Sequence, residues 1–282
     1  MECRSYAESY PVKRIYWNFV NWLRRIRTLL AYSKLVIVYK LHLVRTNRIR
    51  VGGYDIRFGD LRQLVNLYKE IFVQRAYLCA LGDSPIIVDA GANIGLAVLF
   101  FKERYPDARV VAFEPNPSAF KCLKENVEVN GLEGVQLINA ALGGTKGVIT
   151  FYLSTDMASA DVGASAIKEH VAHLHGHKGA INEIAVQCQT LSSFVAADID
   201  LLKLDIEGAE CEVILELGQR LSKVKNVIME YHYNFADASN SLSNILCALE
   251  DNRHMYRILP EEDSTELEQC LNYVIRSKRC SP

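Results

Sequence analysis

Hydrophobic residues recur with two different periods along the chain, and the period changes near residue 84. From Lys13 to Leu30 the large apolar residues are three and four positions apart, which predicts an amphipathic helix with basic residues on its other face. The run RIRVGGYDIRF (48–58) alternates on both sides of two glycines and predicts a hairpin. We therefore expect residues 1–83 to form a basic extension made of a helix, a hairpin and a further helix.

After residue 84, short apolar runs alternate with helical segments, which predicts an α/β fold with a mostly parallel sheet covered on both faces. Two of the apolar runs, at 148–153 and 184–189, flank a polar segment. Two further runs, at 255–260 and 271–277, are expected to close the sheet as an antiparallel pair. We expect one domain over residues 84–282, with residues 154–183 inserted as a lid. The predicted strands are IIVDA (86–90), ARVVAFE (108–114), VQLINAAL (135–142), VITFYL (148–153), IAVQCQ (184–189), LLKLDI (201–206), NVIMEYH (226–232), MYRILP (255–260) and LNYVIRS (271–277).

Composition and charge indicate a protein with a large core and exclude some classes of partner. Half of the 282 residues are apolar and 23% are charged, so the chain can bury a large core. The net charge is -1, but residues 1–50 hold eleven Lys and Arg against two acidic residues. A basic arm on an acidic body argues against a nucleic-acid-binding protein. Residues 13–30 of this arm could lie on an anionic membrane surface, on the protein's own core or on a partner subunit. If the partner is a second copy of the chain, the protein is a homo-oligomer.

The compartment is predicted from what the sequence lacks. It shows no apolar signal core, no uncharged apolar run of membrane-spanning length and no CxxC pair among its eight scattered cysteines. We therefore expect a cytoplasmic protein with reduced thiols, which is at most peripheral at a membrane.

The first predicted parallel strand runs into the turn VDAGANIG (88–95), the place where an open parallel sheet binds its ligand. Gly91 and Gly95 leave room for a ligand near the backbone, and Asp89 adds an acceptor. A nicotinamide fingerprint would need glycines at Asn93 and Leu96, so an NAD-dependent oxidoreductase is disfavoured.

The next two strand ends complete the predicted pocket. Glu114, in FEPNP, can accept both hydroxyls of a ribose, and the small residues after the third strand leave a slot for a flat base such as adenine. The turn and the acidic strand end together favour a cofactor that contains adenosine. The candidate cofactor-binding residues are Asp89, Gly91, Asn93, Gly95, Glu114, Asn116, Asn139, Ala140 and Ala141.

VDAGANIG, FEPNP, KLDIEGAE (203–210) and MEYH (229–232) together resemble the FkbM family of S-adenosylmethionine-dependent methyltransferases, within the class I methyltransferase fold. The resemblance covers roughly residues 84–276. It implies a seven-stranded sheet with one antiparallel strand, S-adenosylmethionine at the glycine turn and Glu114 on its ribose. It also implies methyl transfer, commonly to a hydroxyl of a sugar or natural product.

Charged residues on a strand expected to be central mark the catalytic candidates. Asp205 is the first candidate, acting on the acceptor directly or through a partner, and Lys203 could pair with it or polarise the acceptor. His232, at the end of the next strand, is either the proton acceptor or a satisfied structural histidine. With Glu207 and Glu230, Asp205 and His232 could also collect a divalent cation, but we rank metal-independent base catalysis first.

Two further alternatives remain open. The cluster EHVAHLHGHKG (169–179) in the inserted segment could bind a transition metal, although a mobile lid over the acceptor is favoured. The predicted function is O-methylation of a hydroxyl on a small molecule or glycan. The alternative is a non-catalytic adapter that keeps the fold and holds a membrane or a partner.

Overall fold

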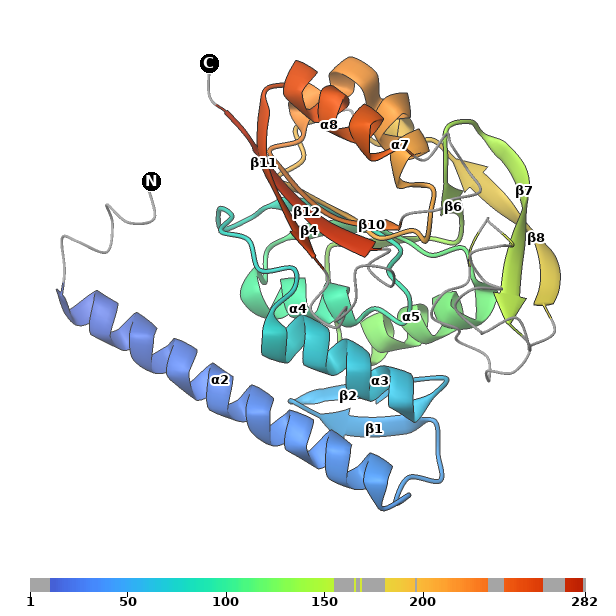
Figure 1. Ribbon diagram of the computed structural model, residues 1–282. Helices are drawn as coiled ribbons and strands as arrows, with labels where there is room; N and C mark the ends of the chain where they lie inside the picture. Colours follow the sequence, from blue (N-terminus) through green and yellow to red (C-terminus); the bar gives the residue numbers. More distant parts are fainter. Residues whose placement is uncertain are drawn as a thin grey trace. The chain divides into compact units, whose positions relative to one another are not determined.

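The computed structural model describes the elements of two compact units, drawn in Figure 1. The residues that the structure describes are 11–154, 165, 168, 181–195, 197–232, 241–260 and 272–280. One unit consists of Met1–Ile56 and Leu61–Ala76, and the other of Arg57–Asp60 and Tyr77–Pro282. The boundary at Ala76 lies a few residues before the one expected from the sequence.

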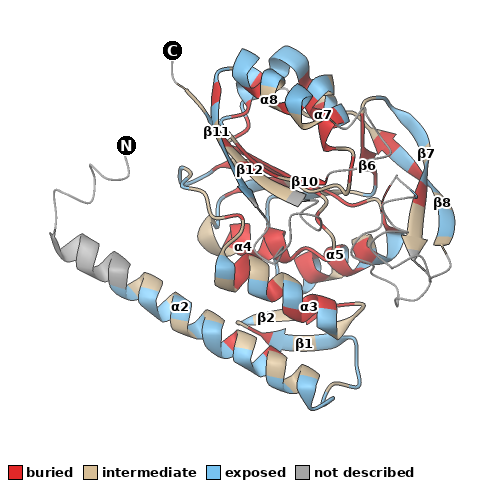
Figure 2. Ribbon diagram, viewed as in Figure 1, coloured by how far each residue is buried: buried red, intermediate tan, exposed pale blue. Residues whose placement is uncertain are grey.

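The first unit contains the predicted helix and hairpin. Helix α2 contacts β1, α3 and the π-helical turn η1 through a narrow inner face that includes the buried Ala31 and Leu35. These two residues lie beyond the predicted end at Leu30, and their burial explains why the helix continues further than its outer apolar stripe indicated. Figure 2 shows exposed and intermediate residues along most of the described part of α2. The elements are α2 (Pro11–Lys40), β1 (Arg48–Val51), β2 (Tyr54–Arg57), α3 (Leu61–Tyr68) and η1 (Lys69–Gln74).

The second unit is built on a seven-stranded sheet in the order β11-β12-β10-β9-β3-β4-β5. The five strands from β10 to β5 in this order are parallel, whereas β12 runs antiparallel to both β10 and β11. This arrangement confirms the predicted seven-stranded sheet with one antiparallel strand. The strands are β3 (Ile86–Ala90), β4 (Arg109–Phe113), β5 (Val135–Ile138), β9 (Leu201–Leu204), β10 (Asn226–His232), β11 (His254–Pro260) and β12 (Asn272–Arg279).

Helices cover both faces of this sheet, as α/β alternation requires. Helices α4 and α5 lie on one face, and α7 and α8 lie on the other (Figure 1). Short 3-10 turns connect some of the elements. The helices and turns are α4 (Leu96–Arg104), α5 (Pro117–Val129), α7 (Glu210–Leu217), α8 (Leu242–Asp251), η2 (Leu191–Ser193) and η3 (Gly218–Lys223).

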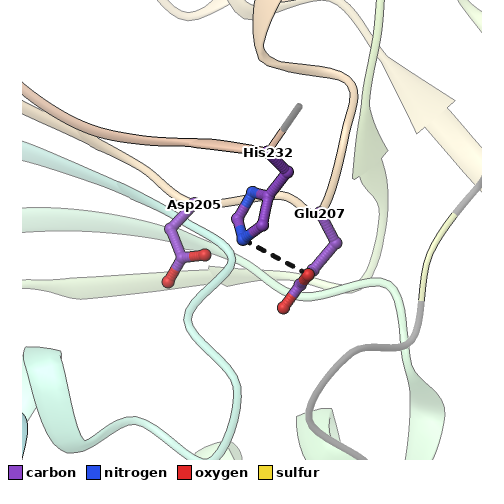
Figure 3. Close-up of side chains that lie close together, drawn as sticks. All are labelled: Asp205, Glu207 and His232. Carbon is purple, nitrogen blue, oxygen red and sulfur yellow. Dashed lines mark ion pairs between the residues drawn. The ribbon is translucent and has the colours of Figure 1, made fainter. Parts of the chain in front are cut away.

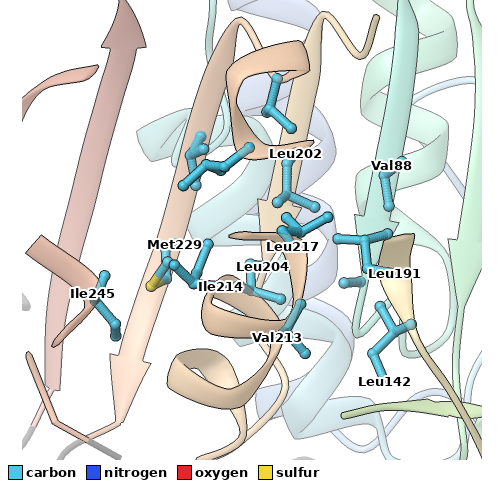
Figure 4. Packing of buried hydrophobic residues seen from close by; sticks show 14 of the residues in the cluster. Val88, Leu142, Leu191, Leu202, Leu204, Val213, Ile214, Leu217, Met229 and Ile245 are labelled. Carbon is cyan, nitrogen blue, oxygen red and sulfur yellow. The ribbon is translucent and has the colours of Figure 1, made fainter. Parts of the chain in front are cut away.

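The main hydrophobic core lies between the central strands and helices α7 and α8 (Figure 4). Leu202 and Leu204 of β9 and Met229 of β10 point toward Val213 and Ile214 of α7, and all five are fully buried. Burying aliphatic side chains of this size stabilises the fold by about 1.5–3 kcal/mol each. The core therefore fixes the carboxyl ends of β9 and β10 beside each other.

One strand prediction was wrong. The run VQLINAAL was expected to form a single strand, but it divides into β5 and β6 (Ala141–Leu142). The side-chain amide of Asn139 donates to the carbonyl oxygens of Glu114 and Pro115, at 2.8 and 3.2 Å, which turns the chain away from the sheet. β6 then pairs with β8 (Ile181–Gln189), which also pairs with β7 (Gly147–Ser154), so the inserted pair belongs to a separate three-stranded sheet.

Candidate active site

The turn VDAGANIG leaves the carboxyl end of β3 and packs closely on its neighbours. The amides of Gly91 and Ala92 donate to the carbonyl of Phe113 at the end of β4, at 3.1 and 2.9 Å. Gly91 has φ +82°, and a Cβ added there would lie 1.7 Å from the carbonyl oxygen of Asp205. Gly91 is thus required by contact with the end of β9 and by its left-handed backbone, rather than by ligand approach alone.

Glu114 follows β4 and faces this turn. Its Oε2 accepts a hydrogen bond from the Asn93 amide and its Oε1 accepts one from the Asn116 amide, both at 2.8 Å. The side chain is buried, and burial raises the pKa of Glu114 to about 7. Each carboxylate oxygen keeps a second lone pair. The carboxylate is thus held by two backbone amides and can still accept two hydroxyl groups.

The other predicted cofactor-binding residues differ in their contacts and burial. Asn116 is the N-cap of α5, where its Oδ1 accepts from the amides of Ser118 and Ala119. Asn139 is exposed and bonds the backbone of the FEPNP turn. Ala140 and Ala141 are both buried, and Ala141 packs in the core of the three-stranded sheet. The direct binding roles of these residues remain predictions.

Lys203 is the cation at the centre of the site. Its ammonium group lies 3.2 Å from Asp89 Oδ1 and 3.3 Å from Asp205 Oδ2, and it donates to the carbonyl of Gly91 at 2.6 Å. Burial alone would lower the pKa of Lys203, but the charges of Asp89 and Asp205 outweigh it and raise that pKa. Lys203 therefore ties the ends of β3 and β9 to the glycine turn as a permanent cation.

His232, at the end of β10, is surrounded by carboxylates. Its Nδ1 lies 3.0 Å from Oε1 of Glu210, and its Nε2 lies 3.4 Å from both Glu207 Oε2 and Glu230 Oε1. Burial would lower the pKa of His232, but the charges of Glu207 and Glu210 raise it well above its ordinary value. These carboxylates therefore favour the protonated form of the ring over the neutral one.

The ends of β9 and β10 bring three of the candidate side chains together. One ligand atom each from Asp205, Glu207 and His232 lie within 4.8 Å of one another (Figure 3). Adjacent parallel strands predicted the closeness of Asp205 and His232. Glu207 joins them, as the candidate cation site expected, and its backbone has φ +58°, in the left-handed region, which strand alternation did not predict.

Three residues of the site were not identified as site residues from the sequence. The hydroxyl of Tyr77 donates to Oδ2 of Asp205 at 3.3 Å. Glu210, the first residue of α7, is fully buried against His232 and accepts from the amides of Ile206 and Gly208. Ser165 donates to the backbone carbonyl of Glu207. Of these three residues, only Glu210 lies in a sequence motif described above, KLDIEGAE.

The chemistry available at this edge of the sheet is ionic and hydrogen-bonding. Glu114 fits a ribose, and the carboxylates beyond β9 and β10 fit either an acceptor hydroxyl or a cation. The residues His170, His173, His175 and His177 lie outside the described residues, as does most of the predicted lid. Among the described residues, no helix is both long enough and apolar enough to cross a membrane.

Comparison with known proteins matches the same part of the chain. Residues 89–267 match the Methyltransferase FkbM domain. Methyltransferase sdnD of Sordaria araneosa is 33% identical over 189 residues, covering 58% of this chain and 73% of the relative. The 31-O-demethyl-FK506 methyltransferase FkbM of Streptomyces tacrolimicus is 28% identical over 233 residues, covering 72% and 87%. The hexuronic acid methyltransferase AglP of Haloferax volcanii is 27% identical over 203 residues, covering 70% and 79%.

Proposed function

Because the chain belongs to the FkbM family of S-adenosylmethionine-dependent methyltransferases, we propose that it methylates a hydroxyl group of a sugar, a glycolipid or a secondary metabolite. The family match fixes the class of enzyme and its methyl donor. The nature of the acceptor is the proposal. The names of two relatives support it, since one is a 31-O-demethyl-FK506 methyltransferase and another a hexuronic acid methyltransferase.

The main support for the binding site of the methyl donor is the buried carboxylate of Glu114. Two amides, from Asn93 and Asn116, hold its oxygens at the edge of the sheet where parallel strands end. Hydroxyl donors of a ribose would use the remaining lone pairs. Asp89, Asn139, Ala140 and Ala141 are proposed to shape the rest of the donor pocket around this contact.

S-adenosylmethionine supplies a methyl group that its sulfonium has already activated. The residues of this chain then have to hold the acceptor in line and take its proton. We assign proton acceptance to Asp205, whose side chain is 22% exposed beside the ammonium of Lys203. The proton of the acceptor hydroxyl passes to Asp205, the O–CH3 bond forms as the S–CH3 bond breaks, and S-adenosylhomocysteine remains.

Lys203 and His232 act differently from Asp205 in this scheme. Lys203 is buried and engaged with Asp89, Asp205 and the turn, which favours a positioning role. His232 orients the carboxylates around it and donates hydrogen bonds, rather than accepting the proton first. The assignment of His232 predicts that a variant of this residue loses turnover while S-adenosylhomocysteine still binds.

The test is a transfer assay with methyl-labelled S-adenosylmethionine against nucleoside-diphosphate sugars, glycolipids and phenolic metabolites, with the methylated atom located by mass spectrometry and NMR. Transfer to oxygen supports the proposal, and transfer to nitrogen or carbon alone contradicts it. Asp205→Ala separates an enzyme from a non-catalytic adapter. The enzyme loses turnover in this variant, whereas an adapter's partner binding is indifferent to it.

A second proposal concerns α2, whose outer face carries large apolar side chains on a helix with seven Lys or Arg and no Asp or Glu. These side chains are 45–67% exposed and lie along one stripe: Phe19, Trp22, Leu23, Leu29, Leu30 and Ile37, with Leu41 directly after the helix. Exposed apolar stripes flanked by cations are typical of helices that lie in an anionic membrane surface. We propose that α2 binds such a surface, which would also bring the enzyme to lipid-linked acceptors.

Tryptophan fluorescence tests this directly, because both tryptophans of the chain, Trp17 and Trp22, lie in α2. Vesicles with phosphatidylglycerol should shift the emission to the blue, and vesicles of phosphatidylcholine alone should not. Leu30→Glu should abolish the shift, whereas Val129→Glu, at an exposed position of α5, should not. No shift with either vesicle, together with a concentration-dependent increase in size, would instead assign the stripe to a second copy.

A further inference from the structure

The cluster beyond β9 and β10 has the ligand types and the spacing of a cation site. An oxygen of Asp205, an oxygen of Glu207 and a nitrogen of His232 lie within 4.8 Å of one another. Ligands at about 2.1 Å from one ion lie roughly 3 Å apart. The 3.4 Å between Nε2 of His232 and Oε2 of Glu207 is close to that value. The side chains of Asp205 and Glu207 are 22% and 19% exposed, so both are accessible to solvent.

The orientation of His232 is fixed from behind. Its Nδ1 lies 3.0 Å from Oε1 of Glu210, which is fully buried and belongs to α7 rather than to the cluster. In this contact the Nδ1–H group donates to Oε1 of Glu210, and Nε2 is turned toward Glu207 and Glu230. Metal-binding histidines characteristically donate their other ring nitrogen to a carboxylate in this way.

The charge of the surroundings is an independent observation. Among the described residues of the site, five carboxylates surround two cations, Lys203 and His232. Oε2 of Glu210 is also buried with no hydrogen-bond partner. Uncompensated charge at buried positions is costly. A divalent cation would offset part of that excess. The carboxylates are those of Asp89, Asp205, Glu207, Glu210 and Glu230.

We infer that Asp205, Glu207 and Nε2 of His232 bind a divalent cation, which displaces the Nε2 proton on binding, with Glu230 beside the ring. Two or three carboxylate oxygens and one imidazole favour Mn²⁺ or Mg²⁺ over softer ions. This inference rests on the proposed function and assigns the acceptor side of the same site. An ion there would hold the acceptor hydroxyl at the end of β9 and favour the loss of its proton. The proton that the hydroxyl loses passes to the carboxylate oxygen of Asp205 that does not bind the ion, and the methyl transfer is otherwise as described above.

The test uses Mn²⁺ as the probe on the full-length protein after treatment with EDTA. Titration followed by the electron paramagnetic resonance of free Mn²⁺ should reveal one saturable site per chain. Asp205→Asn and His232→Gln should each weaken it by at least about tenfold, and Glu210→Gln by about tenfold through the lost orientation of the ring. Glu128→Gln, at a 63% exposed position of α5, is the matched control and should bind as the wild type does.

Calorimetry with S-adenosylhomocysteine on the same samples separates the two hypotheses. Binding of this ligand without saturable Mn²⁺ binding overturns the cation site and leaves the methyltransferase assignment intact. Equal Mn²⁺ affinity in the wild type and Asp205→Asn also overturns it. If His232→Gln does not fold, as circular dichroism would show, a rise in the melting temperature of the wild type with Mn²⁺, absent in Asp205→Asn, decides the question.

Discussion

Replacing Glu114 with Gln is expected to weaken the binding of S-adenosylhomocysteine and to remove its pH dependence. The carboxylate offers an acceptor to each of two ribose hydroxyls while both oxygens are held by the amides of Asn93 and Asn116. A carboxamide keeps one acceptor oxygen and places an NH2 group against one of these amides. Hydrogen bonds to charged groups contribute about 1.5–3 kcal/mol, so the loss of one predicts about 10- to 100-fold weaker binding.

The pH dependence follows from the pKa of Glu114, which burial raises from 4.5 to about 7. Since the folded-state pKa is the higher one, protonated Glu114 contributes stability that is fully present below about pH 4.5 and is lost as the pH rises through about 7. At about 1.4 kcal/mol for each pH unit, this contribution is about 3 kcal/mol. Ribose hydroxyls bind the ionised form, so affinity should fall about tenfold for each pH unit below 7.

Two measurements check this reasoning. Calorimetry at pH 6 in buffers of different ionisation enthalpy should show the release of close to one proton per ligand bound by the wild type, and of none by Glu114→Gln. Urea unfolding of the ligand-free proteins at pH 5 and pH 8 should show that the wild type loses more stability than the variant as the pH rises. Glu128→Gln, on the exposed face of α5, should behave as the wild type does in both assays.

The result that would refute the reasoning is a ligand affinity that is equal in Glu114→Gln and the wild type, or equal pH profiles for the two. Either would mean that no ribose hydroxyl donates to this carboxylate. A variant that loses affinity while keeping the same pH profile would show that a different group titrates on binding.

Three further substitutions give expected outcomes. Lys203→Met should destabilise the protein by about 3–5 kcal/mol in urea unfolding, because it leaves Asp89 buried without its cation. Lys225→Met removes an ion pair whose lysine is 46% exposed, and it should cost about 1 kcal/mol or less. Gly91→Ala should lower the melting temperature and abolish ligand binding, because its Cβ would meet the carbonyl oxygen at the end of β9; unchanged binding would contradict the packing described for the turn. Asn116→Ala should cost about 0.5–2 kcal/mol through loss of the α5 cap, and an unchanged urea midpoint would show that the cap contributes nothing.

Much of the sheet could be predicted because its central strands are almost wholly apolar. IIVDA and NVIMEYH correspond to β3 and β10 residue for residue. Strands buried on both faces carry this strong signal, whereas no short connection indicates that β3 pairs with β9, which lies far downstream in the sequence. The division of VQLINAAL was missed because it depends on a side-chain amide, that of Asn139, which bonds to a distant turn.

The site was predictable as far as strand ends determine it. Asp205 and His232 end neighbouring strands, and Glu114 follows the strand beside the glycine turn. The place of Glu207 in this cluster was also expected, but its left-handed backbone was not, because residues with a Cβ seldom adopt it. Tyr77 precedes every motif, and only the folded chain brings its hydroxyl to Asp205.

The position of β12 in the sheet has a consequence for synthesis on the ribosome. This strand is made after β11, yet it lies between β11 and β10 and is the hydrogen-bonded neighbour of both. Until it emerges, a nascent chain presents one open edge of β10 and leaves β11 without its partner. Release before Asn272 would therefore leave an aggregation-prone product, even though every side chain discussed above for chemistry had already been translated.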